Sequence, residues 1–109
     1  MDGETIARRY YRAIDEGDDE GLASLLDADF VHERPDRTLA GRERFVSFMR
    51  EDRPRTDTAH EVETVYEGPG GVAVAGRLLT ADAGVELFRF LDVFAIEGDV
   101  ATGLRTFTA

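Results

Sequence analysis

The spacing of apolar residues changes near residue 57, and this change constrains the fold more than any other feature of the chain. Before it, apolar side chains recur at helical spacing, as at Ile6, Tyr10 and Ile14. After it, apolar and polar residues largely alternate, which is the period of a β-strand. The sequence therefore predicts an α+β domain in which helices precede a sheet.

The first half of the chain is predicted to hold three helices and one short strand. In chain order these are a helix over residues 2–16, a second helix after Asp18 that turns Leu22, Leu25 and Leu26 inward, the strand "FVHERP" at 30–35, and the helix "RERFVSFMRED" at 42–52. Glycine and proline mark their ends, because glycine adopts the left-handed conformation of a helix terminus and proline lacks a backbone donor. Gly17 ends the first helix, Pro35 stops the strand and Pro54 closes the third helix.

The second half is predicted to form a meander of strands over residues 57–67, 71–81, 85–97 and 100–107. Their connections, "GPGG", "DAG" and "GD", contain glycine and are short enough for hairpins. The expected fold is three N-terminal helices packed on a curved antiparallel sheet, with a short first strand and a four-strand meander. A length of 109 residues suits one domain over residues 1–109.

Asp92 lies in the otherwise apolar stretch "VELFRFLDVFAIEGD". Alternation places Phe88, Phe90 and Phe94 on its face of the strand. A carboxylate in that position loses hydration, so it either faces a cavity in which it acts or meets a polar partner.

The opposite face of the same strand is also apolar, with Leu87, Leu91 and Val93. Three short helices cover only one face of a sheet, so the other face needs a second chain to exclude water. We therefore expect a homodimer through the outer face of the sheet.

The charge of the chain limits its partners. Twenty-three acidic residues oppose 13 basic ones, giving a net charge of −10, and every basic residue is arginine. Excess negative charge disfavours binding to nucleic acid and to anionic membranes, so neither is expected as a partner. An acidic chain without lysine is typical of a halophilic protein, whereas a GC-rich genome that favours arginine codons is the alternative.

The composition also limits location and cofactors. The chain has no apolar run of membrane-spanning length and no signal peptide, which predicts a cytoplasmic protein. Without cysteine there is no disulfide or thiolate metal site. Two histidines without a paired carboxylate motif make a poor metal site, so no metal and no cofactor are expected.

The order of elements, together with "RYYRAIDEGDDEGLASLLDADFVHERP" and "LDVFAIEGD", resembles the nuclear transport factor 2-like superfamily, in particular its SnoaL-like and ketosteroid isomerase-like branches. The resemblance covers essentially the whole chain and implies a cone-shaped fold around a small-molecule pocket. It implies no single activity, because the superfamily hosts isomerases, cyclases, dehydratases, epoxide hydrolases and non-enzymes on one pocket.

The isomerase branch implies specific roles for three positions. There, a tyrosine of the first helix and a protonated aspartate of a late strand hold an oxyanion, while a second aspartate acts as base. Matched on the quoted stretches, Tyr10 and Asp92 take the two donor positions and Arg34 stands where the base belongs. Arginine cannot accept a proton, so the chain is not expected to be a standard ketosteroid isomerase.

His32 is the first candidate to replace the missing base, and His60 is the second. Alternation places Phe30, His32 and Arg34 on one face of the first strand, and histidine is suited to proton transfer near neutral pH. Arg34 either pairs with Asp92 or binds an anionic group of a ligand. The residues expected to line the pocket are Phe30, Arg34, His60, Tyr66, Phe90 and Phe94.

Three functions remain open at this point. The first is acid–base catalysis, of isomerase, cyclase or hydrolase type, on an apolar small molecule that carries a carbonyl or hydroxyl group. The second is a non-catalytic module that binds an amphipathic acid, and the third is a structural dimer whose pocket is filled by its own side chains.

Overall fold

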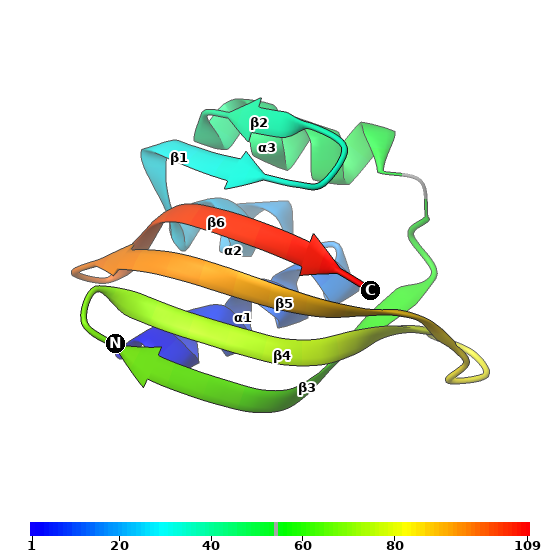
Figure 1. Cartoon of the computed structure of the whole chain (residues 1–109). Helices are drawn as coiled ribbons and strands as arrows, with labels where there is room; N and C mark the ends of the chain where they lie inside the picture. Colours follow the sequence, from blue (N-terminus) through cyan, green and yellow to red (C-terminus); the bar gives the residue numbers. More distant parts are fainter. Residues whose placement is uncertain (54) are drawn as a thin grey trace.

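A curved six-stranded sheet carries the helices on one of its faces (Figure 1). The computed structural model describes residues 1–53 and 55–109, so the helix end predicted at Pro54 lies outside the described residues. The helices are α1 (Gly3–Glu16), α2 (Asp19–Ser24), α3 (Arg42–Ser47) and the π-helical turn η1 (Phe48–Asp52), which continues α3. The strands are β1 (Leu26–Glu33), β2 (Thr38–Ala40), β3 (Thr58–Gly68), β4 (Gly71–Thr80), β5 (Glu86–Glu97) and β6 (Val100–Thr108), in the order β2-β1-β6-β5-β4-β3.

Helix α1 forms where the sequence predicts it, and both of its ends are capped. The Asp2 side chain accepts a hydrogen bond from the backbone N–H of Thr5 at 2.8 Å, which satisfies a donor that the first turn leaves free. Gly17 ends the helix in the left-handed conformation, with a φ of 69°. Ile6 and Ile14 are buried beneath the helix, as the helical spacing predicts.

The meander of strands β3 to β6 is confirmed, with every predicted boundary within one residue of the observed one. Phe90, Asp92 and Phe94 of β5 are buried on the helix side of the sheet, whereas Leu91 is exposed on the other side. Long strands with alternating apolar and polar residues, joined by glycine turns, are well predicted from sequence, because the alternation between the two faces of the sheet is repeated many times along each strand.

The first half of the sheet differs from the prediction in three respects. Strand β1 pairs with β6 in parallel, so the sheet is not wholly antiparallel, and the three-residue strand β2 was not predicted. Leu26 opens β1 instead of belonging to the second helix. Apolar periodicity cannot detect these features. It does not distinguish parallel from antiparallel pairing, and a three-residue strand is too short to show a period. Leu26 is buried, as it would also be on the inner face of the second helix.

A β-bulge interrupts β3 between Val62 and Thr64. Beyond the bulge the two faces of the strand exchange, so that Val65 packs against the core while Tyr66 is 57% exposed. A bulge inserts one extra residue into a strand, and an alternating sequence does not mark its position.

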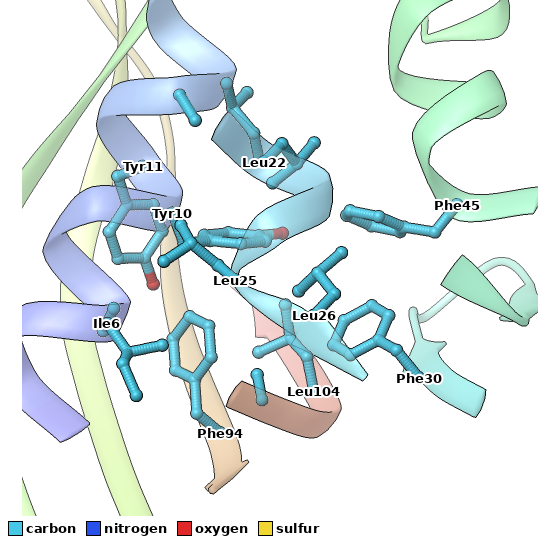
Figure 2. Close-up of a cluster of buried hydrophobic side chains, with 14 of the residues drawn as sticks. Ile6, Tyr10, Tyr11, Leu22, Leu25, Leu26, Phe30, Phe45, Phe94 and Leu104 are labelled. Atoms are coloured by element: carbon cyan, nitrogen blue, oxygen red, sulfur yellow. The ribbon is translucent and has the colours of Figure 1, made fainter. Parts of the chain in front are cut away.

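Aromatic side chains fill the space between the helices and the sheet (Figure 2). Phe30, Phe45 and Phe94 are almost fully buried, and Tyr10 meets the ring of Phe94 edge to face at 5.2 Å. This packing fixes α1 against β1 and β5, the strands that carry the buried His32 and Asp92. Among the described helices, none is long and apolar enough to cross a membrane.

Candidate functional site

A cavity of about 360 Å³ lies between the helix side of the sheet and the helices. Its polar lining comes from six elements or their flanking segments and consists of Tyr10, His32, Arg34, Arg53, Arg55, Thr58, His60, Asp92, Thr106 and Thr108. Its apolar lining consists of Ile14, Pro35, Met49, Leu78, Leu87, Phe88 and Phe90. A size of this order suits a small organic molecule.

Asp92 is buried at the cavity wall and has two hydroxyl partners. Tyr11 donates a hydrogen bond to its Oδ2 at 2.6 Å, and Thr106 donates to its Oδ1 at 2.5 Å. Burial raises the pKa of Asp92, because it penalises the charged form, and the hydrogen bonds from Thr106 and Tyr11 oppose that rise only in part. Asp92 therefore both meets polar partners and faces a cavity.

The tyrosine that donates a hydrogen bond to Asp92 is Tyr11 and not Tyr10. The sequence predicts Tyr10 and Asp92 as joint donors to a ligand oxygen, and that role stays a prediction. Neighbouring helical residues point about 100° apart, and both tyrosines of α1 are buried, so spacing alone could not choose between them. Figure 2 shows the two rings directed differently, with Tyr10 extending toward Phe45. Tyr10 still lines the cavity, and burial raises its pKa well above the usual value, so its hydroxyl stays protonated.

His32 belongs to the same hydrogen-bonded chain. Its Nε2 lies 2.8 Å from Thr106 Oγ1. Because the single Thr106 proton points to Asp92, His32 Nε2 must be the donor, which leaves Nδ1 as an unprotonated acceptor. His32 Nδ1 is buried and has no hydrogen-bond partner among the described residues. Burial, with a smaller effect of the Arg34 cation, lowers the pKa of His32 to about 3, so the ring is neutral near pH 7.

His60 has a different environment, in which a carboxylate holds the ring. Asp15 of α1 accepts from His60 Nδ1 at 2.7 Å and from the His60 backbone N–H at 3.0 Å. The ring lies beside Tyr11 and Phe90, at centroid distances of 4.9 and 5.7 Å. Since Nδ1 donates to Asp15, the second ring nitrogen of neutral His60 keeps a free lone pair, as a general base requires.

Sequence reasoning selected His60 but missed Asp15. A usable signal existed, because Asp15 lies four residues after Tyr11 and therefore on the same face of α1. Tyr11 and Asp15 bind Asp92 and His60 of the cavity wall, whereas the sequence pattern assigns Asp15 to the acidic run "DEGDDEG", which indicates a solvated helix junction.

Arg34 lines the cavity but does not form an ion pair with Asp92. Its guanidinium lies 3.5 Å from Asp36 and 5.2 Å from the ring centre of Phe48. The Arg34 cation lowers the pKa of Asp92 only slightly, so burial dominates. Arg53 and Arg55 also line the cavity, and sequence reasoning missed both.

The remaining predicted site residues fall into three groups. Phe90 lines the cavity, whereas Phe30 and Phe94 belong to the core beside it. Tyr66 lies on the outer face of the sheet, because of the bulge in β3, and does not reach the cavity. Within residues 1–53 and 55–109, no group of three or more histidine or acidic side chains is placed to hold a metal ion.

Comparison with known proteins identifies a family and a common fold. A model of the SnoaL-like domain family matches residues 7–102. No curated protein sequence matches the chain.

Among solved structures, a nuclear transport factor 2-like protein of unknown function from Cytophaga hutchinsonii is similar over 100% of this chain and 91% of its own, with a TM-score of 0.84 and 14% identity. A candidate polyketide cyclase of Sinorhizobium meliloti has a TM-score of 0.81 and 14% identity over 94% of each chain. A candidate ketosteroid isomerase of Kribbella flavida has a TM-score of 0.77 and 21% identity, over 96% of this chain and 76% of its own.

Proposed function

The chain belongs to the SnoaL-like domain family, and from this premise we propose that its cavity carries out acid–base catalysis on an apolar small molecule with a carbonyl or hydroxyl group. The reaction would be of isomerase, cyclase or hydrolase type. One observation carries the proposal: a carboxylate-held histidine, His60 with Asp15, lines the same cavity as Asp92. A base and an acid with different environments are the minimum for moving a proton within one bound molecule.

His60 would act as the base in this reaction. Its free ring nitrogen takes a proton from the substrate, and the Asp15 carboxylate stabilises the imidazolium that forms. Asp15 also fixes the orientation of the ring through its second bond to the His60 backbone. His32, the base expected from the sequence, suits this role less well, because its Nε2 is bonded to Thr106 and its pKa is lowered to about 3.

Asp92 would act on the substrate oxygen. Burial raises the pKa of Asp92, so its carboxyl group keeps its proton to a higher pH than the carboxyl group of an ordinary aspartate. Both oxygens of the protonated group can still accept from Tyr11 and Thr106, so the added proton is available to a substrate carbonyl. Tyr10 offers a second hydroxyl from the cavity wall.

The experiment uses 2-tetralone, an apolar ketone with acidic α-hydrogens. We expect the wild-type protein to accelerate α-hydrogen exchange in D₂O, followed by proton NMR. His60→Gln should lower the protein-dependent rate about 10²–10⁴-fold, as expected for loss of a general base. His32→Gln serves as the comparison and should retain more of the rate. If wild type binds 2-tetralone without exchange above background, or His60→Gln exchanges as fast as wild type, the assignment fails.

A non-catalytic module that binds an amphipathic acid is the second candidate. It is favoured by Arg34, which stands where the isomerase branch has its base. Mass spectrometry of molecules released from the purified protein, before and after incubation, separates the two functions, because a binding module releases its ligand unaltered.

We also propose that the protein forms a homodimer through the outer face of its sheet. Leu91 and Phe107 are paired across β5 and β6 and are 38% and 47% exposed. Beside them, a hollow of about 490 Å³ is lined partly by small residues, including Ala73, Ala95 and Gly103. Sedimentation should give twice the monomer mass, and Leu91→Glu should give the monomer. A monomeric wild type at micromolar concentration would refute this assembly.

A further inference from the structure

The cavity wall is rich in positive charge, although the chain as a whole is acidic. Arg34, Arg53 and Arg55 line the cavity, and Asp92 is the only carboxylate among the lining residues that the structure describes. The chain has a net charge of −10. In such a chain, three guanidinium groups around one cavity form a local site of attraction for an anion.

Two of these arginines already have carboxylate partners. Arg55 makes a two-point contact with Asp57, at 3.1 Å from Nε and 2.8 Å from Nη2. Arg34 lies 3.5 Å from Asp36, which also binds Arg37. Their charge is thus partly neutralised within the protein.

Arg53 differs from both. Within residues 1–53 and 55–109, no carboxylate lies within ion-pair distance of its guanidinium, and its Nη2 donates only a long bond, 3.5 Å, to the backbone oxygen of Ile14. Its Nε is buried and lacks a hydrogen-bond partner among the described residues. A buried donor without a partner costs free energy, and a carboxylate at the guanidinium edge removes that cost through paired N–H···O bonds.

A large part of the remaining lining is apolar. It consists of aromatic and aliphatic side chains, namely Ile14, Met49, Leu78, Leu87, Phe88 and Phe90. This wall suits the hydrocarbon body of a ligand, because burial of apolar surface provides affinity while a few polar groups fix orientation.

We propose that the molecule bound in this cavity is an amphipathic carboxylic acid, whose carboxylate binds Arg53 with Arg34 beside it and whose apolar body lies against the aromatic wall. The inference rests on the proposed function and names its substrate class. The carboxylate anchors one end of the molecule, so that a carbonyl or hydroxyl group elsewhere on it reaches His60 and Asp92.

The test compares two probes of matched shape, 2-naphthoate and its neutral amide, 2-naphthamide, by isothermal titration calorimetry near neutral pH. We expect wild type to bind the carboxylate about tenfold to a hundredfold more tightly, as charged hydrogen bonds require. Arg53→Gln should abolish most of that preference, and Arg53→Lys should keep a smaller part of it, since the charge remains without the paired geometry. Arg44→Gln, an exposed residue of α3 outside the cavity lining, should leave the preference unchanged.

Three results would overturn the inference. Equal affinity of wild type for the two probes excludes an anion site in the cavity. The proposed acid–base function is then still supported if the protein accelerates hydrogen exchange in 2-tetralone. A preference that survives in Arg53→Gln but disappears in Arg34→Gln excludes Arg53 as the anchor. Failure to bind either probe, together with absence of 2-tetralone exchange, removes the proposed function as well.

Discussion

Replacing Thr106 with valine removes a hydroxyl that makes two partly buried hydrogen bonds. The hydroxyl donates to Asp92 Oδ1 at 2.5 Å and accepts from His32 Nε2 at 2.8 Å. Valine has nearly the same shape as threonine, so the substitution leaves little cavity and reports mainly on the lost polar contacts.

The expected cost follows from those two bonds. Loss of the donation to Asp92 costs about 1 kcal/mol. The Nε2–H of His32 is then left without a partner in a ring whose Nδ1 also lacks one among the described residues, which adds about 1–3 kcal/mol. We therefore expect Thr106→Val to lower the free energy of unfolding by about 2–4 kcal/mol, measured by urea denaturation near neutral pH.

The cost should also grow with pH. Asp92 has a raised pKa in the folded protein, and the Thr106 hydrogen bond acts to lower it. An acid whose folded pKa exceeds its unfolded pKa binds its proton more tightly in the fold, so its contribution to stability is lost as the pH rises through the folded pKa. Without Thr106 that pKa rises further, and the variant should lose more stability in mildly alkaline than in mildly acidic solution.

Thr102→Val provides the matched control on the same strand. The Thr102 hydroxyl makes one long, exposed hydrogen bond, 3.4 Å, to the backbone oxygen of Ala95. We expect this substitution to change stability by less than about 0.5 kcal/mol. A cost for Thr106→Val no greater than that of the control, or one that does not change with pH, would refute the hydrogen-bonded chain.

Three further predictions concern stability. Raising KCl from about 0.1 M to a few molar should raise the melting temperature, because salt screens repulsion among 23 acidic residues and strengthens apolar burial, whereas a flat or falling value would contradict a halophilic protein. Burial lowers the pKa of His32 to about 3, so the unfolded chain binds more protons than the folded protein. The free energy of unfolding should therefore fall as the pH drops from about 6.5 toward that value, and His32→Gln should weaken this dependence on pH. In Gly71→Ala the new Cβ would clash with the Phe94 carbonyl oxygen, so urea denaturation should show a decrease of more than about 2 kcal/mol in the free energy of unfolding. The control Gly68→Ala, whose new Cβ would have open space, should show a decrease of less than about 0.5 kcal/mol.

The position of Asp92 could be predicted because β5 is long and regular. Each residue of an alternating strand repeats the same choice of face, so the inward side of Phe90, Asp92 and Phe94 follows from the pattern alone. The same regularity identified Leu91 as outward-facing. Resemblance to a family then connected Asp92 to a cavity, which composition and periodicity do not reveal.

Other features of the site depend on the position of a single residue, which the spacing of apolar residues does not determine. Two adjacent buried tyrosines on α1 satisfy the same helical stripe, and only the packed structure shows that Tyr11 reaches Asp92. Tyr66 leaves the predicted face because one extra residue is inserted upstream in β3. Arg53 follows η1, outside any regular element, so no period could place it at the cavity.

The partnership of Asp15 and His60 joins residues 45 positions apart. It forms because α1 lies over the sheet and its inward face meets β3, a contact set by tertiary packing. Helical spacing could show that Asp15 shares a face with Tyr11, but it could not show which strand that face meets.

The tautomer of His60 in the ligand-free protein tests the proposed base most directly, because it requires no substrate. In the neutral form of the His60 ring, nitrogen-15 NMR of histidine-labelled protein should place the proton on Nδ1, where it is held by Asp15, and leave Nε2 unprotonated. His32 should show the opposite tautomer in the same spectrum, with the proton on Nε2 toward Thr106. A neutral His60 with its proton on Nε2 would contradict the account, because the nitrogen needed to accept a substrate proton would already carry one.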